Sequence, residues 1–426
     1  FPLTMATLYD DDGPILYAQQ FREPSLFAGD CQTGTDLATR LPFKLWTTAM
    51  NWIPALGWRF LDVNPYHATW LLTLVQGLGI AFAVYLLTLS LAGRRSLAFA
   101  AMVFACLAAP WIWAPANYGN DRSWNFMPYP ANLALASALL AFRSLAISRP
   151  KAALGWLAVT AVIHPGLALQ ADAMAVLFLL GAARAGWRPV LGQLAGAALV
   201  GLIAVAPGLW VRHTLPGDPL PHAEIMAGMR LNMHIWPWRY PENLASCLAT
   251  ALPWLLLGLL AVWRGPGLGP AYRRLWFISI GVALIFSLVH ILGAVLEQPA
   301  LLTLIGLRAW VWPLLLTVPL VVQDAWNRMR DSDLAGAFFR ILCLALPLLP
   351  AMYPRFGMLA GAALLAGLAR KATGTWGWLA EAEAGMLFAL WGFFFLLPVM
   401  GLVGRSGFWL ILPKAGTAFP WLHCCW

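Results

Sequence analysis

Long apolar runs separated by short polar connections dominate this sequence. Runs of about 17–25 apolar residues are long enough to cross a membrane as helices. The pattern predicts spans at 68–93, 96–117, 130–148, 152–164, 167–183, 189–211, 244–263, 275–296, 300–322, 335–352, 355–369 and 379–403. The fourth run is short, and the "HPG" of residues 164–166 at its end predicts a broken or re-entrant turn. We therefore expect an all-α, polytopic transmembrane helical protein with about 11–13 spans.

The segment before the first span has a different pattern. Residues 14–62 contain no spanning run, and "PILYAQQFREPSLFAGD" and "LPFKLWTTAMNWIPALGWRF" are typical of amphipathic helices lying on a membrane. We expect three regions: an extracytoplasmic loop with juxtamembrane helices over 1–67, a transmembrane domain over 68–403, and a C-terminal tail over 404–426. Because "FPLTMATL" resembles the end of an apolar segment, we also expect a helix or signal to precede Phe1.

Composition supports the membrane class. The 426 residues are 61% hydrophobic and 11% charged, whereas a soluble domain has roughly 25% charged residues. The net charge of +9 does not indicate a nucleic-acid partner, because the basic residues occur in short clusters between apolar runs. The expected surroundings are therefore membrane lipids.

Lys and Arg also predict the orientation, because they cluster in every second connection. The clusters are Arg94 and Arg95; Arg149 and Lys151; Arg184 and Arg188; Arg264, Arg273 and Arg274; Arg328 and Arg330; and Arg370 and Lys371. Such connections face the cytoplasm, so the alternate connections face outward in a bacterial cytoplasmic (inner) membrane. In this topology all seven histidines fall on the outer side or in the outer third of a helix. We expect any active face to be extracytoplasmic.

Aspartates near the start of the chain are the first candidates for chemistry. Asp10 and Asp11 belong to an acidic triplet, which is either a helix cap before Pro14 or a source of catalytic carboxylates. The shared outer face favours the catalytic interpretation. In the connection around 114–129, Asp121 and Arg122 lie beside aromatic residues, a combination suited to stacking on sugar rings and binding hydroxyl groups.

The outer connection 212–243 is longer than typical connections, and loops of this length are commonly binding lids. The candidate binding residues in it are His222, Glu224, Arg230, His234 and Trp236. A solvated polar loop is the alternative interpretation. His222 and Glu224 lack the spacing of a zincin HExxH motif, which argues against a zinc protease.

Three further candidates lie in or beside apolar runs. His164 ends one span and is either a packing residue or a functional residue, since burying an ionisable group in a membrane is costly. Arg308 is expected about two turns inside the span that starts near Ala300, with His290 at similar depth on the preceding span. Arg308 either extends to the interface or neutralises a lipid phosphate.

Several short motifs together resemble the C-type (GT-C) membrane glycosyltransferases, and more closely an uncharacterised bacterial branch of that superfamily. They are Tyr9–Asp11, Pro24–Asp30, His164–Gly166, His234–Trp238 and Arg308. The resemblance implies sugar transfer from a polyprenyl-phosphate-linked donor to an extracytoplasmic glycan, lipid or protein. It assigns the general base to Asp10 or Asp11, and stabilisation of the leaving phosphate to a cationic or histidine cluster. A divalent metal ion is a candidate cofactor that the sequence does not decide.

Two other function classes stay open. A transporter or flippase for a lipid-linked or anionic substrate also accounts for ionisable residues inside spans, such as His164, Asp172 and Arg308. Against it, the sequence has no internal repeat and no symmetric pair of broken helices. The third class is a non-catalytic scaffold of an envelope complex, with the polar loops as docking surfaces.

Overall fold

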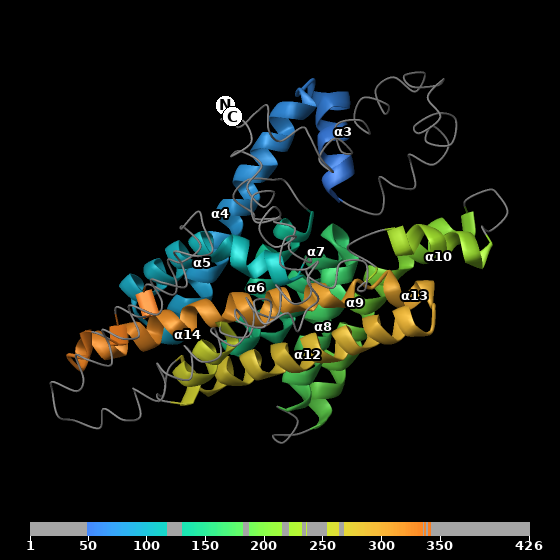
Figure 1. Cartoon of the computed structure of the whole chain (residues 1–426). Coiled ribbons are helices and arrows are strands. Elements are labelled where there is room, and N and C mark those ends of the chain that lie inside the picture. Colours follow the sequence, from blue (N-terminus) through green and yellow to red (C-terminus); the bar gives the residue numbers. More distant parts are fainter. Residues whose placement is uncertain are drawn as a thin grey trace, which may run out of the picture. The chain divides into compact units, whose positions relative to one another are not determined.

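The computed structural model describes residues 49–116, 130–181, 187–214, 221–231, 236, 254–263 and 268–334, with 336–337 and 340–341. Every regular element in these ranges is helical, which confirms the all-α prediction (Figure 1). Some predictions fall outside the described residues. These are the first juxtamembrane helix, Asp10, Asp11, Asp121, Arg122, His234, the spans from 355 onward and the C-terminal tail.

The chain divides into two compact units. Unit 1 contains Phe1–Ser90 and Arg122–Glu224, and unit 2 contains Leu91–Asp121 and Ile225–Trp426. Each unit therefore joins segments that are far apart in the sequence.

Unit 1 consists of closely packed helices. They are α3 (Ala49–Leu61), α4 (Pro65–Ala92, of which the last two residues belong to unit 2), α6 (Pro130–Ala146), α7 (Pro150–Ile163), α8 (Pro165–Leu180) and α9 (Trp187–Thr214). Helix α7 packs against α6, α8 and α9, and α8 also packs against α6 and α9. Buried alanines on α6, including Ala131, Ala134 and Ala138, allow this close approach. Ser137 and Thr160 share a hydrogen bond of 2.8 Å between α6 and α7.

Unit 2 is built around α14 (Val311–Arg330). The other elements are α5 (Arg95–Ala116), α10 (His222–Leu231, of which the first three residues belong to unit 1), a helix over Trp254–Trp263, α12 (Pro270–Val295), α13 (Pro299–Leu302) and the 3-10 helix η2 (Gly306–Trp310). Helix α14 packs against α5 and α12, and Figure 1 shows α12 and α14 as long neighbouring helices. Every residue from Val311 to Ala325 is buried. A helix that is apolar on all sides belongs in the interior of a bundle, and α14 occupies that place.

Pro319 lies inside α14 and cannot donate a hydrogen bond to the carbonyl one turn before it. That carbonyl belongs to Leu315, and side chains from neighbouring helices donate hydrogen bonds to the carbonyls of the residues before and after it. Trp254 Nε1 donates to Leu314 O at 2.9 Å, and the Tyr272 hydroxyl donates to Leu316 O at 2.7 Å. Such donors allow a proline within an apolar helix.

The described part contains three helical segments that are long and apolar enough to cross a membrane: Leu74–Ala92, Pro270–Val295 and Pro299–Arg330. The exposed faces of the first two segments are apolar as well. Leu71, Leu74, Leu78 and Phe82 form an exposed stripe on α4. An exposed apolar stripe of this kind is typical of a helix that contacts lipid. Other predicted spans, such as 130–148 and 152–164, correspond to shorter apolar helices.

Candidate functional site at an interrupted helix

The apolar segment Pro299–Arg330 is not a continuous helix. Helix α13 ends at Leu302, Ile305 adopts the left-handed region at φ 43°, and η2 then leads into α14 at Val311. The predicted span 300–322 therefore lies within a segment that is long and apolar enough to cross a membrane, but this segment is interrupted before α14. Arg308 lies on η2, before α14 begins, and not two turns inside a helix. Its side chain is partly exposed.

Close packing between Gly306 and α12 explains the interruption. A Cβ atom at Gly306 would overlap the carbonyl oxygen of Phe286 and lie 2.7 Å from its carbonyl carbon. Gly306 N–H donates to His290 Nδ1 at 3.3 Å, and the His290 side chain is fully buried. His290 therefore holds the backbone of η2 against α12, a structural role that the sequence did not predict.

The far end of η2 is also bound to α12. Trp310 Nε1 donates to Ser287 Oγ at 3.0 Å, and the Ser287 hydroxyl donates to Ala283 O at 2.7 Å. Gly306 and Trp310 thus attach both ends of η2 to one helix, with Arg308 between them. This attachment fixes the backbone that carries the Arg308 guanidinium.

Helix α10 packs against the same end of α12. Met226 of α10 forms an apolar cluster with Ala294 and Leu302, and Met229 and Trp236 pack against that cluster. Arg230 forms an ion pair with Glu297, which lies two residues after the end of α12. Its guanidinium also lies 5.6 Å from the centre of the Trp236 ring.

The structure therefore brings four predicted binding residues into one packed assembly of α10, α12, α13 and η2. They are Arg230, Trp236, His290 and Arg308, and we call this assembly the interrupted-helix site. His222 and Glu224 lie in the first turn of α10, and both are exposed. The connection 212–243, which was predicted to face outward, thus contributes the helix α10 to the site.

His164 has a local role in unit 1. It is the single residue between α7 and α8, where its backbone is extended at φ −149° and ψ 95°. Its Nδ1 accepts a hydrogen bond of 3.1 Å from Leu167 N–H in the first turn of α8. The "HPG" sequence therefore breaks the helix as predicted, and the histidine caps the helix that follows.

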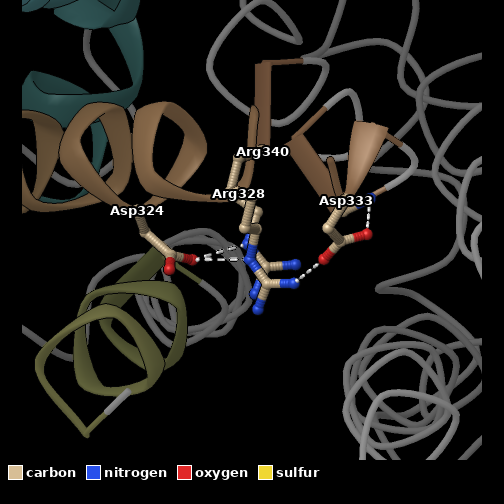
Figure 2. Close-up of polar contacts among 5 residues, drawn as sticks. Asp324, Arg328, Asp333 and Arg340 are labelled. Carbon is tan, nitrogen blue, oxygen red and sulfur yellow. Dashed lines mark hydrogen bonds and ion pairs between the residues drawn. The ribbon is translucent and has the colours of Figure 1, made fainter. Parts of the chain in front are cut away.

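A buried cluster of charged side chains lies at the C-terminal end of α14. The sequence did not predict it, because Arg328 was interpreted only as a topology anchor. Figure 2 shows Asp324, Arg328, Asp333 and Arg340 converging. The Nε atoms of Arg328 and Arg340 donate to Asp324 Oδ2 at 3.2 and 2.9 Å. Arg328 also donates to Asp333 Oδ2 at 2.5 Å, and Gly336 N–H donates to Asp333 Oδ1 at 3.0 Å.

The pairing of opposite charges makes this cluster a structural anchor between α14 and residues 333–340. The side chains of Asp324, Arg328 and Arg340 are each less than a tenth exposed. The spacing of Asp324 and Arg328, four residues apart on a helix, was a usable signal for part of it. Nothing in the sequence indicated Arg340.

No group of three or more His, Cys, Asp or Glu side chains suited to a metal ion occurs within the described ranges. No protein-family model, curated protein or solved structure matches the chain. The resemblance to C-type glycosyltransferases consequently stays a prediction.

Proposed function

We propose that the protein is a membrane glycosyltransferase that binds a polyprenyl-phosphate-linked sugar at the interrupted-helix site. The observation that carries the proposal is the position of Arg308, a partly exposed arginine on a short 3-10 segment between apolar helices. A guanidinium at such a position is a cation that can bind an anion through charge-assisted hydrogen bonds. A lipid phosphate supplies an anion at the depth of a membrane interface.

Other residues of the interrupted-helix site suit the other parts of such a donor. A guanidinium can bind phosphate through two parallel charge-assisted hydrogen bonds, a geometry that lysine does not reproduce. Met229 on α10 and Trp236 are partly exposed where they pack against the buried Met226 cluster, and Met229 provides adaptable apolar surface there. Apolar and aromatic groups of this kind suit a polyprenyl chain and a sugar face.

The chemical step is assigned through the family resemblance. Asp10 or Asp11 would accept the proton of the acceptor hydroxyl while that oxygen attacks the anomeric carbon of the sugar. The bond from this carbon to the phosphate oxygen would break, and a cation would stabilise the phosphate that leaves. Arg308 is our candidate for that cation.

Donor binding to purified Arg308 variants tests the proposal. With a short-chain polyprenyl-phosphate sugar as probe, Arg308→Ala should weaken binding by about ten- to a hundredfold, the equivalent of about 1.5–3 kcal/mol for hydrogen bonds to a charged group. Arg308→Lys should recover only part of the loss. Arg330→Ala is the control, because Arg330 is an exposed arginine in the last turn of α14. Unchanged binding in both Arg308 variants would contradict the proposal.

A product assay separates binding from transfer. The double substitution Asp10→Asn and Asp11→Asn should abolish sugar transfer while donor binding persists, because an amide cannot act as the base. Full product formation in this variant would exclude both aspartates as the base.

A transporter or flippase is the second candidate, favoured by the short helices α7 and α8 and by the buried carboxyl group of Asp172 on α8. Short or interrupted helices near ionisable groups are typical of substrate paths in transporters. Reconstitution into liposomes distinguishes the classes. Translocation of a labelled polyprenyl-phosphate sugar without product would favour the transporter, and neither activity would favour a scaffold.

A further inference from the structure

Asp172 is a single acidic side chain in the middle of α8, among apolar neighbours. It is 8% exposed, and Ala168, Ala171 and Ala175 beside it on the helix are fully buried. Helix α8 packs against α6, α7 and α9 in unit 1. The carboxyl group therefore lies within the helical bundle of this unit.

The carboxyl group of Asp172 lies against a position on α9 that has no side chain. A Cβ atom at Gly201 would be 3.5 Å from Asp172 Oδ2. The other oxygen, Oδ1, is buried and has no hydrogen-bond partner. The glycine thus leaves room for the carboxyl group without supplying a donor to it.

Among the side chains that the structure describes on α6, α7 and α9, no positive charge is paired with Asp172. Helix α9 has no ionisable residue from Val190 to Ala206. Lys151 on α7 is exposed, and Arg143 on α6 donates to Ser90 Oγ at 2.7 Å. His164, before α8, accepts the hydrogen bond from Leu167 N–H. A buried carboxylate without a paired charge is strongly unfavourable, whereas the neutral acid is far less costly.

We propose that Asp172 is a proton-binding site in the apolar interior of unit 1. The carboxylate takes up one proton and becomes a carboxylic acid, and no other bond is made or broken. A proton fits better than a metal cation, because no cluster of three His, Cys, Asp or Glu side chains surrounds Asp172 in the described residues. A protonatable group inside an apolar bundle is suited to proton-coupled movement. This site is independent of the phosphate site proposed above.

Carbodiimide labelling of the full-length protein in detergent tests the proposal. Dicyclohexylcarbodiimide enters apolar regions and adds to protonated carboxylic acids, whereas a water-soluble carbodiimide reacts with exposed carboxyl groups. At neutral pH, mass spectrometry should find the apolar reagent on Asp172 and the water-soluble reagent on the exposed Asp331. Asp172→Asn should lose the apolar label and Asp172→Glu should keep it. Absence of the apolar label from Asp172, or its replacement there by the water-soluble label, would overturn the proposal.

A stability measurement gives a second readout that does not depend on labelling. Asparagine resembles the neutral acid in size and charge, so Asp172→Asn should unfold thermally at nearly the same temperature as the parent. A large fall in the unfolding midpoint would show that the negative charge is needed, and would contradict a protonated Asp172. Neither measurement involves sugar transfer, so a failed glycosyltransferase proposal leaves both interpretable.

Discussion

The charged side chains at the two ends of the segment Pro299–Arg330 differ in burial and in pairing. At one end, Asp324 and Arg328 are buried and paired with each other, and Arg340 also donates to Asp324. At the other end the helix is interrupted, Arg308 is partly exposed, and the Arg230–Glu297 ion pair is about half exposed. Buried charges with complete pairing fix a structure, whereas partly exposed charges on an irregular backbone can exchange their partners for a ligand. The difference indicates a structural role for the first end and makes the second end the candidate for the binding proposed above.

Of the substitutions that test this difference between the two ends, Asp324→Asn should lower the stability of the folded protein most. The substitution removes the charge that Arg328 and Arg340 share and leaves two buried guanidinium groups without it. Loss of one partner of a buried ion pair costs about 3–5 kcal/mol. Thermal unfolding in detergent should therefore show a clearly lower midpoint. The exposed Asp331, in the turn after α14, provides a matched control as Asp331→Asn. Equal midpoints for the two variants would refute the anchoring role.

Gly306→Ala should have the next largest effect, at the interrupted end. The added methyl group would overlap the Phe286 carbonyl, and overpacking of this kind costs about 1–3 kcal/mol. Gly281→Ala on α12 is the control, because a Cβ there meets no atom within 4 Å. Alanine should stabilise that helix by about 0.5–1 kcal/mol. The two unfolding midpoints should thus move in opposite directions. A Gly306→Ala variant with the midpoint of the parent would contradict the close packing of Gly306 against Phe286.

The Arg230–Glu297 pair should give the smallest effect. Its side chains are 48% and 47% exposed, and exposed ion pairs contribute about 0–1 kcal/mol. A double-mutant cycle with Arg230→Met and Glu297→Gln, measured by thermal unfolding, should give a coupling energy in that range that falls with added salt. A coupling energy as large as the loss of stability in Asp324→Asn would contradict the distinction between the two ends.

Much of the helical architecture is predictable from local sequence. Apolar runs located α4 and α12, and prolines at or near the first residue mark the starts of α7 and α8. Proline suits that position because its fixed φ matches the helix and its missing N–H is not needed there. The break at His164 was also predictable, since Pro165 follows it. These features depend on a few neighbouring residues.

The candidate site was only partly predictable. The polar residues of the outer connection and Arg308 stand out because charge is rare in this chain. The arrangement of these residues cannot be recognised in the sequence, because Gly306 resembles any other glycine in an apolar run. Its effect comes from the backbone of Phe286, twenty residues earlier in the chain, which lies where a side chain would otherwise be.

The sequence by itself determined that this protein is helical and apolar, because the length and hydrophobicity of each run are local properties. The tertiary structure alone decided which charges are paired and where the helix is interrupted. Arg340 binds Asp324 across sixteen residues, and Asp172 remains without a hydrogen-bond partner for Oδ1 although its exposure equals that of Asp324. Both residues are aspartates within apolar helices, so composition does not distinguish them. The difference comes from the side chains that the neighbouring helices place against them.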